Sequence, residues 1–99
     1  MGLTYVSATV TAKDGKEPEL NQALAAVVAE VRAEDGCIRY DLHKSDDGKT
    51  FLFYEIWESM DHLVAHGKTP HMDVMRAATE DLVTGPAEVN IWKSVDVAD

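Results

Sequence analysis

The sequence lacks the residues that mark several common kinds of functional site. Cys37 is the only cysteine, which excludes an internal disulfide framework and a zinc site built from several cysteines. There is no Gly-x-Gly-x-x-Gly motif, phosphate-binding loop or nucleophile elbow, so nothing favours a bound nicotinamide, flavin or nucleotide. No apolar run approaches the ~20 residues that a membrane-spanning helix requires.

Basic residues are also scarce. Nine Lys and Arg residues stand against 18 Asp and Glu residues, which gives a formal net charge of −9. Nucleic acid and anionic membrane surfaces repel such a chain, so neither is expected as a partner. The first six residues lack the basic region and apolar core of a secretory signal. We therefore expect a cytoplasmic protein with a single domain over residues 1–99.

The first part of the chain predicts a strand followed by a helix. Apolar and polar residues alternate over residues 3–12, which is the period of a strand. Pro18 suits the first turn of a helix, where its missing N–H costs nothing. Apolar residues then recur at helical spacing to about residue 33, so we expect one continuous helix over 18–33.

A hairpin is predicted next. Residues 37–44 and 50–57 both have strand character, and the segment between them is rich in turn-forming residues. In the first of these strands, one face is expected to carry Ile38, Tyr40 and Leu42. The second strand is apolar on both faces rather than alternating, which indicates that both faces are covered.

The rest of the sequence predicts two short helices and a last strand. Ser59 is a helix N-cap, and Gly67 follows the end of that helix near His66. Thr69 and Pro70 open a further helix, and residues 87–95 return to strand. The order β-α-β-β-α-α-β predicts an α+β fold, a ferredoxin-like sandwich with a four-stranded antiparallel sheet.

One layer of helices covers only one face of such a sheet. The other face of the strand at 50–57 carries Leu52, Tyr54 and Ile56. A second copy of the chain is the simplest cover for these side chains, so we expect a homodimer.

The strand at 50–57 also supplies candidate substrate-binding residues. Its period of two places Phe51, Phe53, Glu55 and Trp57 on one face. Aromatic rings beside one carboxylate suit a planar aromatic or enolic substrate. The same aromatic residues could instead fill the core, with Glu55 satisfied by an arginine or a backbone donor.

Two histidines near the joint between the short helices are candidate catalytic residues. His66 closes one helix, where the dipole favours a cation, and His71 lies in the first turn of the next, where it favours the neutral ring. A general base must be neutral to accept a proton, so His71 is the stronger candidate. Both could instead be solvated residues of the joint. One straight helix cannot present both rings to an ion, so no metal site is expected.

The sequence contains four short motifs, Glu34-Asp35-Gly36-Cys37, Glu55-x-Trp57-Glu58-Ser59, Leu63-x-x-His66 and Thr69-Pro70-His71-Met72. They resemble motifs of the antibiotic biosynthesis monooxygenase family, most closely of its bacterial quinol monooxygenase branch. Together with the order of the elements, the resemblance covers nearly the whole chain. The resemblance implies a dimeric α+β barrel with a cavity between the sheet and the helices of each subunit. Some family members carry an arginine about where Arg76 stands on the last helix, which implies that Arg76 binds an anionic group of the substrate. A salt bridge at the surface is the alternative for Arg76.

The resemblance further implies an oxygenase that needs no cofactor and oxidises a dihydroquinone or related polyphenol with O₂. Its site would consist of His71, His66, Trp57, Glu55, Phe53 and Arg76. Two alternatives stay open. The residues Thr84 to Pro86 and the His66-x-x-Thr69-Pro70-His71 motif resemble an autoinducer phospho-isomerase branch, whose isomerisation passes through an enolate without oxygen. The second alternative is a non-catalytic module that binds a small aromatic molecule.

Overall fold

A computed structural model describes residues 2–97 of the chain. Its helices and strands follow one another in the predicted order, with the first predicted helix divided in two. The elements are β1 (Thr4–Thr11), α1 (Glu17–Ala25), α2 (Val28–Arg32), β2 (Cys37–Lys44), β3 (Thr50–Trp57), α3 (Met60–His66), α4 (Pro70–Thr79) and β4 (Glu88–Trp92).

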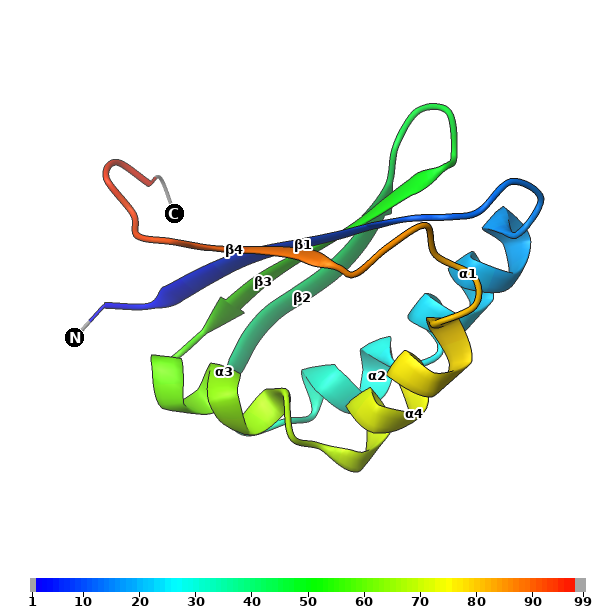
Figure 1. Cartoon of the computed structure of the whole chain (residues 1–99). Coiled ribbons are helices and arrows are strands. Elements are labelled where there is room, and N and C mark those ends of the chain that lie inside the picture. The colour runs from blue at the N-terminus through cyan, green and yellow to red at the C-terminus, as the bar shows by residue number, and fades with distance from the viewer. Residues whose placement is uncertain (1, 98–99) are drawn as a thin grey trace.

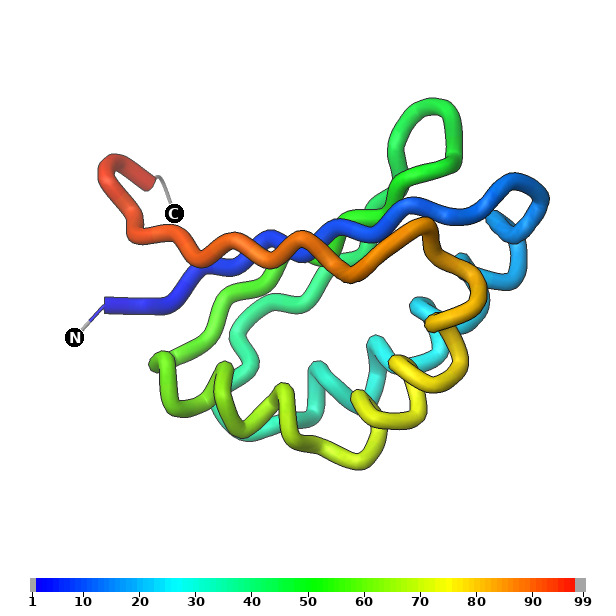
Figure 2. Tube along the Cα trace, viewed as in Figure 1, coloured from blue at the N-terminus to red at the C-terminus, as the bar shows by residue number. Residues whose placement is uncertain are grey.

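The four strands form one antiparallel sheet in the order β2-β3-β1-β4. The helices lie along one face of this sheet, which we call the inner face (Figure 1). The first and last strands run side by side although they are far apart in the sequence (Figure 2). The predicted ferredoxin-like α+β class is therefore confirmed.

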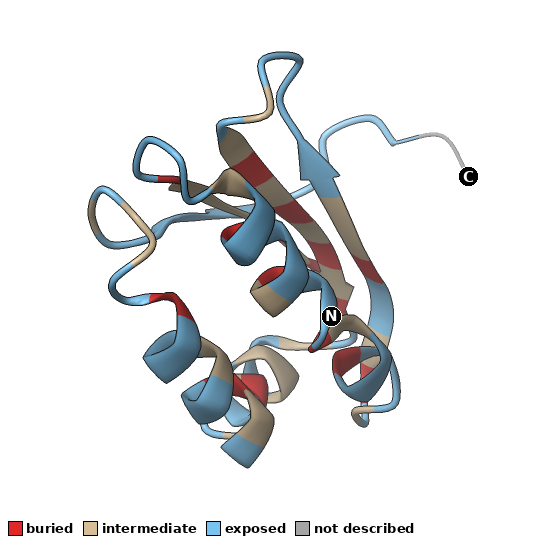
Figure 3. Cartoon of the chain, turned by 90° about the vertical axis from the view of Figure 1, so that its right-hand side faces the viewer, coloured by how far each residue is buried: buried red, intermediate tan, exposed pale blue. Residues whose placement is uncertain are grey.

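Strand β3 occupies the centre of the sheet and divides its side chains between two faces. Phe51, Phe53, Glu55 and Trp57 are buried on the inner face, as the period of two predicts. They pack with buried residues of α1 and α2, such as Leu20, in the core between helices and sheet (Figure 3).

The opposite, outer face of the sheet has no helix over it within the described residues (Figure 1). On this face Leu52, Tyr54 and Ile56 of β3 are only half-buried, and Trp92 of β4 is 54% exposed. Strand register places Tyr5 between Ile56 and Trp92. These apolar side chains form the surface on which we expect a second copy of the chain to pack.

The structure corrects two predicted boundaries and the predicted face of one residue. The continuous helix over 18–33 is wrong, because a turn at Ala26 and Val27 separates α1 from α2. Ile38 is half exposed rather than on the inner face, because a bulge between Cys37 and Arg39 inserts one extra residue opposite β3. The last strand ends at Trp92 rather than near residue 95.

The joint between the two short helices is built largely as predicted. The Ser59 hydroxyl accepts a hydrogen bond from the His62 backbone N–H over 3.3 Å at the start of α3. Thr69 is the N-cap of α4, but its hydroxyl donates to the carbonyl of His66 over 2.9 Å. Thr69 therefore ties the end of α3 to the start of α4. None of the helices in residues 2–97 is long and apolar enough to cross a membrane.

Candidate active site

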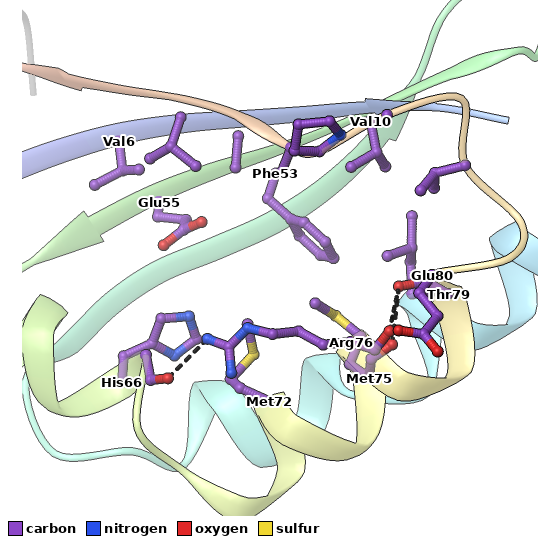
Figure 4. Close-up of a pocket in the computed structure, with 18 of the residues that line it drawn as sticks. Val6, Val10, Phe53, Glu55, His66, Met72, Met75, Arg76, Thr79 and Glu80 are labelled. Carbon is purple, nitrogen blue, oxygen red and sulfur yellow. Dashed lines mark hydrogen bonds between the residues drawn. The ribbon is translucent and has the colours of Figure 1, made fainter.

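A cavity of about 750 Å³ lies between the inner face of the sheet and the helices (Figure 4). Most of its wall is apolar, because β1 and β3 turn alternate side chains toward the helices and α4 faces them with two methionines. The apolar part of the wall includes Val6, Ala8, Val10, Phe53, Met72 and Met75. Residues 83–87 and Val89 of β4 also line the cavity. Its volume lies within the range of about 300–1,000 Å³ typical of small-molecule sites.

Polar side chains interrupt the apolar wall at one end of the cavity. Glu55 reaches in from β3 and His66 from the end of α3, on opposite sides of that end (Figure 4). Arg76 of α4 also lines the cavity, and its Nη2 donates to the carbonyl of Gly67 over 2.7 Å. A carboxyl group, an imidazole and a guanidinium therefore line this end of the cavity, and the other polar or charged side chains of its wall are those of Lys13, Thr79, Glu80 and Thr84.

Glu55 is buried, at 4% exposure. Its Oε1 accepts a hydrogen bond from the indole Nε1–H of Trp57 over 2.9 Å. Desolvation raises the pKa of the Glu55 carboxyl, against the opposing effects of this hydrogen bond and of His66 nearby. Glu55 therefore keeps its proton to a higher pH than an exposed glutamate does. In its protonated form it can donate a hydrogen bond to an oxygen atom in the cavity, and in its ionised form it can accept one.

Trp57 supports the cavity from behind. The side chain is fully buried and does not form part of the cavity wall. Its ring centroid lies 4.7 Å from that of His66, with the rings tilted by 35°. Trp57 therefore holds both polar groups of the cavity end, Glu55 by a hydrogen bond and His66 by packing. Phe53 does line the cavity and stacks on Tyr40 at 4.6 Å.

His66 is buried at 5% exposure and borders the cavity. Its Nδ1 lies 2.9 Å from Oε2 and 3.2 Å from Oε1 of Glu34. A carboxylate only accepts hydrogen bonds, so Nδ1 carries the hydrogen and Nε2 is the acceptor nitrogen of the neutral ring. No other group in residues 2–97 hydrogen-bonds Nε2. The ring is thus oriented as a proton acceptor at the cavity wall.

His71 does not line this cavity. It borders a separate hollow of about 470 Å³ on the helical layer, together with Glu30, Val27 and Val74. Its Nε2 lies 2.6 Å from Oε2 of Glu34, and its Nδ1 lies 3.8 Å from Oε2 of Glu30. Of the two histidines and Trp57 in the predicted site, only His66 lines this cavity.

Glu34 was not among the predicted site residues, although its Glu-x-Gly-Cys motif was noted. It lies in the turn between α2 and β2, where its N–H donates to the carbonyl of Val31 over 2.9 Å. Its side chain is 11% exposed and contacts both histidines. No spacing rule relates it to His66 and His71, which are 32 and 37 residues away. A partly buried glutamate beside an exposed aspartate in a turn carries no signal in a single sequence.

The remaining ionisable groups near the site have restricted roles. Burial raises the pKa of Tyr40 well above its ordinary value, so its hydroxyl is no base at neutral pH. Burial also raises the pKa of the Cys37 thiol, which disfavours its nucleophilic thiolate form. Within residues 2–97, no cluster of three or more His, Cys, Asp or Glu side chains is arranged to hold a metal ion.

With this geometry established, comparison with known proteins identifies the family. Residues 4–78 match the antibiotic biosynthesis monooxygenase family. The chain belongs to this family. It is 37% identical over 79 residues to Rv0793 of Mycobacterium tuberculosis, a monooxygenase by name, covering 80% of this chain and 78% of that protein. It is also 28% identical over 88 residues to YcnE of Bacillus subtilis, likewise a monooxygenase by name, covering 88% and 93% of the two chains.

Solved structures agree with the family assignment. The Rv0793 structure superposes with a TM-score of 0.91 and 32% identity, over 99% of this chain and 100% of that one. PA3566 from Pseudomonas aeruginosa superposes with a TM-score of 0.90 and 30% identity, over 97% of each chain. The predicted resemblance to antibiotic biosynthesis monooxygenases is therefore confirmed, and its quinol branch stays a prediction.

Proposed function

We propose that this protein is a cofactor-independent monooxygenase that oxidises a dihydroquinone or related polyphenol with O₂ in the cavity. One observation carries the proposal. His66 stands at the wall of a largely apolar cavity, with Nδ1 held by the carboxylate of Glu34, which is 11% exposed. This arrangement presents Nε2 as a base, and family membership makes O₂ the expected co-substrate. The base is therefore His66 rather than His71.

The reaction begins when Nε2 of His66 takes the proton of a phenolic O–H. The phenolate passes one electron to O₂, which gives an aryloxyl radical and superoxide. These combine at a ring carbon that bears hydrogen and form a peroxide. Loss of that hydrogen and cleavage of the O–O bond give a new carbonyl, and the second oxygen atom leaves as water. The proton on His66 joins the departing oxygen, so the base is regenerated.

The other residues of the cavity assist this sequence. The Phe53 ring and the two methionines of α4 suit a planar aromatic body. Glu55, whose pKa is raised, can hydrogen-bond a second oxygen of the substrate. Arg76 offers a positive charge for the phenolate or for superoxide, and an apolar cavity strengthens that attraction. We further propose that the active form is a homodimer.

The test is oxygen uptake by the purified protein with reduced naphthoquinones, corrected for oxidation without protein. His66→Gln should lower kcat/KM by about 10²- to 10⁴-fold, the usual cost of losing a general base. His62→Gln is the matched control. That ring belongs to the same helix but hydrogen-bonds Ser59 and faces Asp35 instead of the cavity. The rate of oxygen uptake by His62→Gln should stay near that of the wild type.

Labelled oxygen distinguishes the proposal from its alternatives. With ¹⁸O₂, one labelled atom should appear in the product. Conversion of a phosphorylated ketone without oxygen consumption would favour an isomerase. Tight binding of quinones without any turnover would favour a binding module.

A further inference from the structure

Glu34 is shared between the two histidines through a single oxygen atom. Its Oε2 lies 2.9 Å from Nδ1 of His66 and 2.6 Å from Nε2 of His71. A carboxylate oxygen has two lone pairs, so both contacts can be hydrogen bonds at the same time. Each ring must then donate its hydrogen to Glu34. The protonated nitrogen of His66 is therefore determined by a carboxylate that His71 also holds.

The three residues come from three separate elements and differ in burial. His66 ends α3, Glu34 lies in the turn after α2, and His71 lies in the first turn of α4. Exposed side-chain fractions rise from 6% for His66 to 11% for Glu34 and 17% for His71. His71 therefore lies on the solvent side of Glu34, between the carboxylate and the second hollow.

Glu34 has an alternative to its observed position. Its two oxygens lie within 3.2 Å of Nδ1 of His66, and the second hollow, which His71 borders, lies on the other side. Without His71, the carboxylate could turn toward that hollow and release His66. Glu30, the other charged group beside His71, is 64% exposed at 3.8 Å and cannot replace the imidazole as a donor.

We propose that His71 is a positioning residue, which fixes Glu34 and thereby the tautomer of His66 that accepts the substrate proton. This inference rests on the proposed function. In the proton transfer, the phenolic proton goes to Nε2 of His66, and the Nδ1 hydrogen stays in its bond to Glu34. The ring becomes an imidazolium whose positive charge faces a carboxylate. His71 exchanges no proton with the substrate.

The role predicts different results for two substitutions at position 71. His71→Gln keeps an N–H donor of similar reach to the Nε2 of histidine, so Glu34 stays fixed. This variant should keep kcat/KM within about fivefold of the wild-type value. Removal of a general base would lower kcat/KM by about 10²-fold or more. His71→Leu has no donor and should lower kcat at least tenfold while KM changes little. Glu34→Gln should lower kcat and shift the acid limb of the pH–rate profile, because it removes the charge facing the imidazolium.

A measurement without turnover makes the inference separable from the proposed function. Nitrogen-15 NMR of histidine side chains reports which ring nitrogen carries hydrogen. His66 should be in the Nδ1–H form in the wild type and in His71→Gln, and a mixture in His71→Leu and Glu34→Gln. His62→Gln, the control, should leave the His66 signals unchanged.

The outcomes are distinct. If no quinol is oxidised but the tautomer changes as expected, the proposed function fails and the positioning role stands. If oxidation occurs and the His66 tautomer is the same in all variants, the positioning role is overturned. If His71→Gln loses as much activity as His66→Gln, His71 is a base after all.

Discussion

Trp57 donates its indole N–H to the carboxyl group of Glu55, two residues earlier on the same face of β3, over 2.9 Å. Both side chains are buried, and this bond is the one direct hydrogen bond to Glu55 from a side chain of residues 2–97. One neutral donor does not replace the water that a carboxylate loses on burial. The polar end of the cavity is therefore maintained at a cost to stability, as is common for functional sites.

Glu55→Gln should make stability less dependent on pH. The pKa of Glu55 is raised above 4.5 in the folded protein, so the folded state binds its proton more tightly than the unfolded state. Stability from this group is greatest at low pH and is lost as pH rises from the unfolded pKa through the folded one. Glutamine accepts the Trp57 bond but never ionises. The melting temperature of the variant should exceed that of the wild type at pH 7, and the difference should shrink toward pH 4.

Glu58→Gln provides the control for this experiment, since Glu58 follows the same strand but is exposed. Its melting temperature should track the wild type across the pH range. An equal gain for both variants would show that net charge, rather than burial of Glu55, sets the difference.

Gly36→Ala should destabilise the protein more than Gly48→Ala does. Both glycines have positive φ, +80° and +76°, so each alanine costs about 1–2 kcal/mol of backbone strain. Only at Gly36 would the new methyl group overlap a side chain, the ring of His62, whose Cβ would lie 2.8 Å away. Nothing lies within 4 Å of that methyl position at Gly48. Urea unfolding of both variants measures the steric part as the difference between them.

The double variant Gly36→Ala/His62→Ala should recover part of the loss at Gly36. Residues in contact couple by about 0.5–3 kcal/mol. A double variant as unstable as the sum of its two single changes would contradict the close packing of Gly36 on His62.

Arg76→Ala should lower kcat more than it raises KM, because the phenolate and superoxide that its charge attracts form only after the neutral substrate has bound. The guanidinium lines the cavity and donates to Gly67 and Asp73 over 2.7 and 3.0 Å. It is about half exposed, so its interaction with these anions should be worth only about two- to fivefold in kcat. The comparison is Arg32→Ala, which removes an equal charge from the Asp41 pair outside the cavity. An equal fall in kcat for both would indicate a general effect of net charge.

The sequence allowed the fold to be predicted in most respects because its signals are local. The bounds of β3 follow from an apolar run between turn residues, and the Ser59 cap follows from its side-chain chemistry. The missed features depend on the surroundings. The bulge that exposes Ile38 arises from the pairing of β2 with β3. The turn at Ala26 and Val27 interrupts a helical spacing of apolar residues, although the sequence has no glycine or proline there.

The site was predicted less completely than the fold. Glu55, Phe53, His66 and Arg76 do line the cavity. His71 lies behind its wall, because helix packing decides on which side of a helical layer a ring lies. Trp57, at the end of β3, also lies behind the wall, because it is fully buried and packs against His66. Glu34 could not be found, since its role depends on two contacts made across more than 30 residues of chain.

The outer face of the sheet is expected to be the interface of a homodimer. Leu52, Tyr54 and Ile56 are half-buried on the outer face of the sheet, beside Trp92 at 54% exposure. An apolar sheet face of this kind is expected to be covered by a second copy of the chain, and stable homodimers bury on the order of 1,200–2,000 Å² or more. Light scattering at micromolar concentration should therefore give twice the mass of one chain. Ile56→Asp should shift the protein to monomer or aggregate, because it would bury a charge at the centre of this face. Val74→Asp, at a valine of α4 that is 69% exposed, should leave the mass unchanged. A wild-type protein that stays monomeric, or an Ile56→Asp variant that stays dimeric, would show that this face is not the interface.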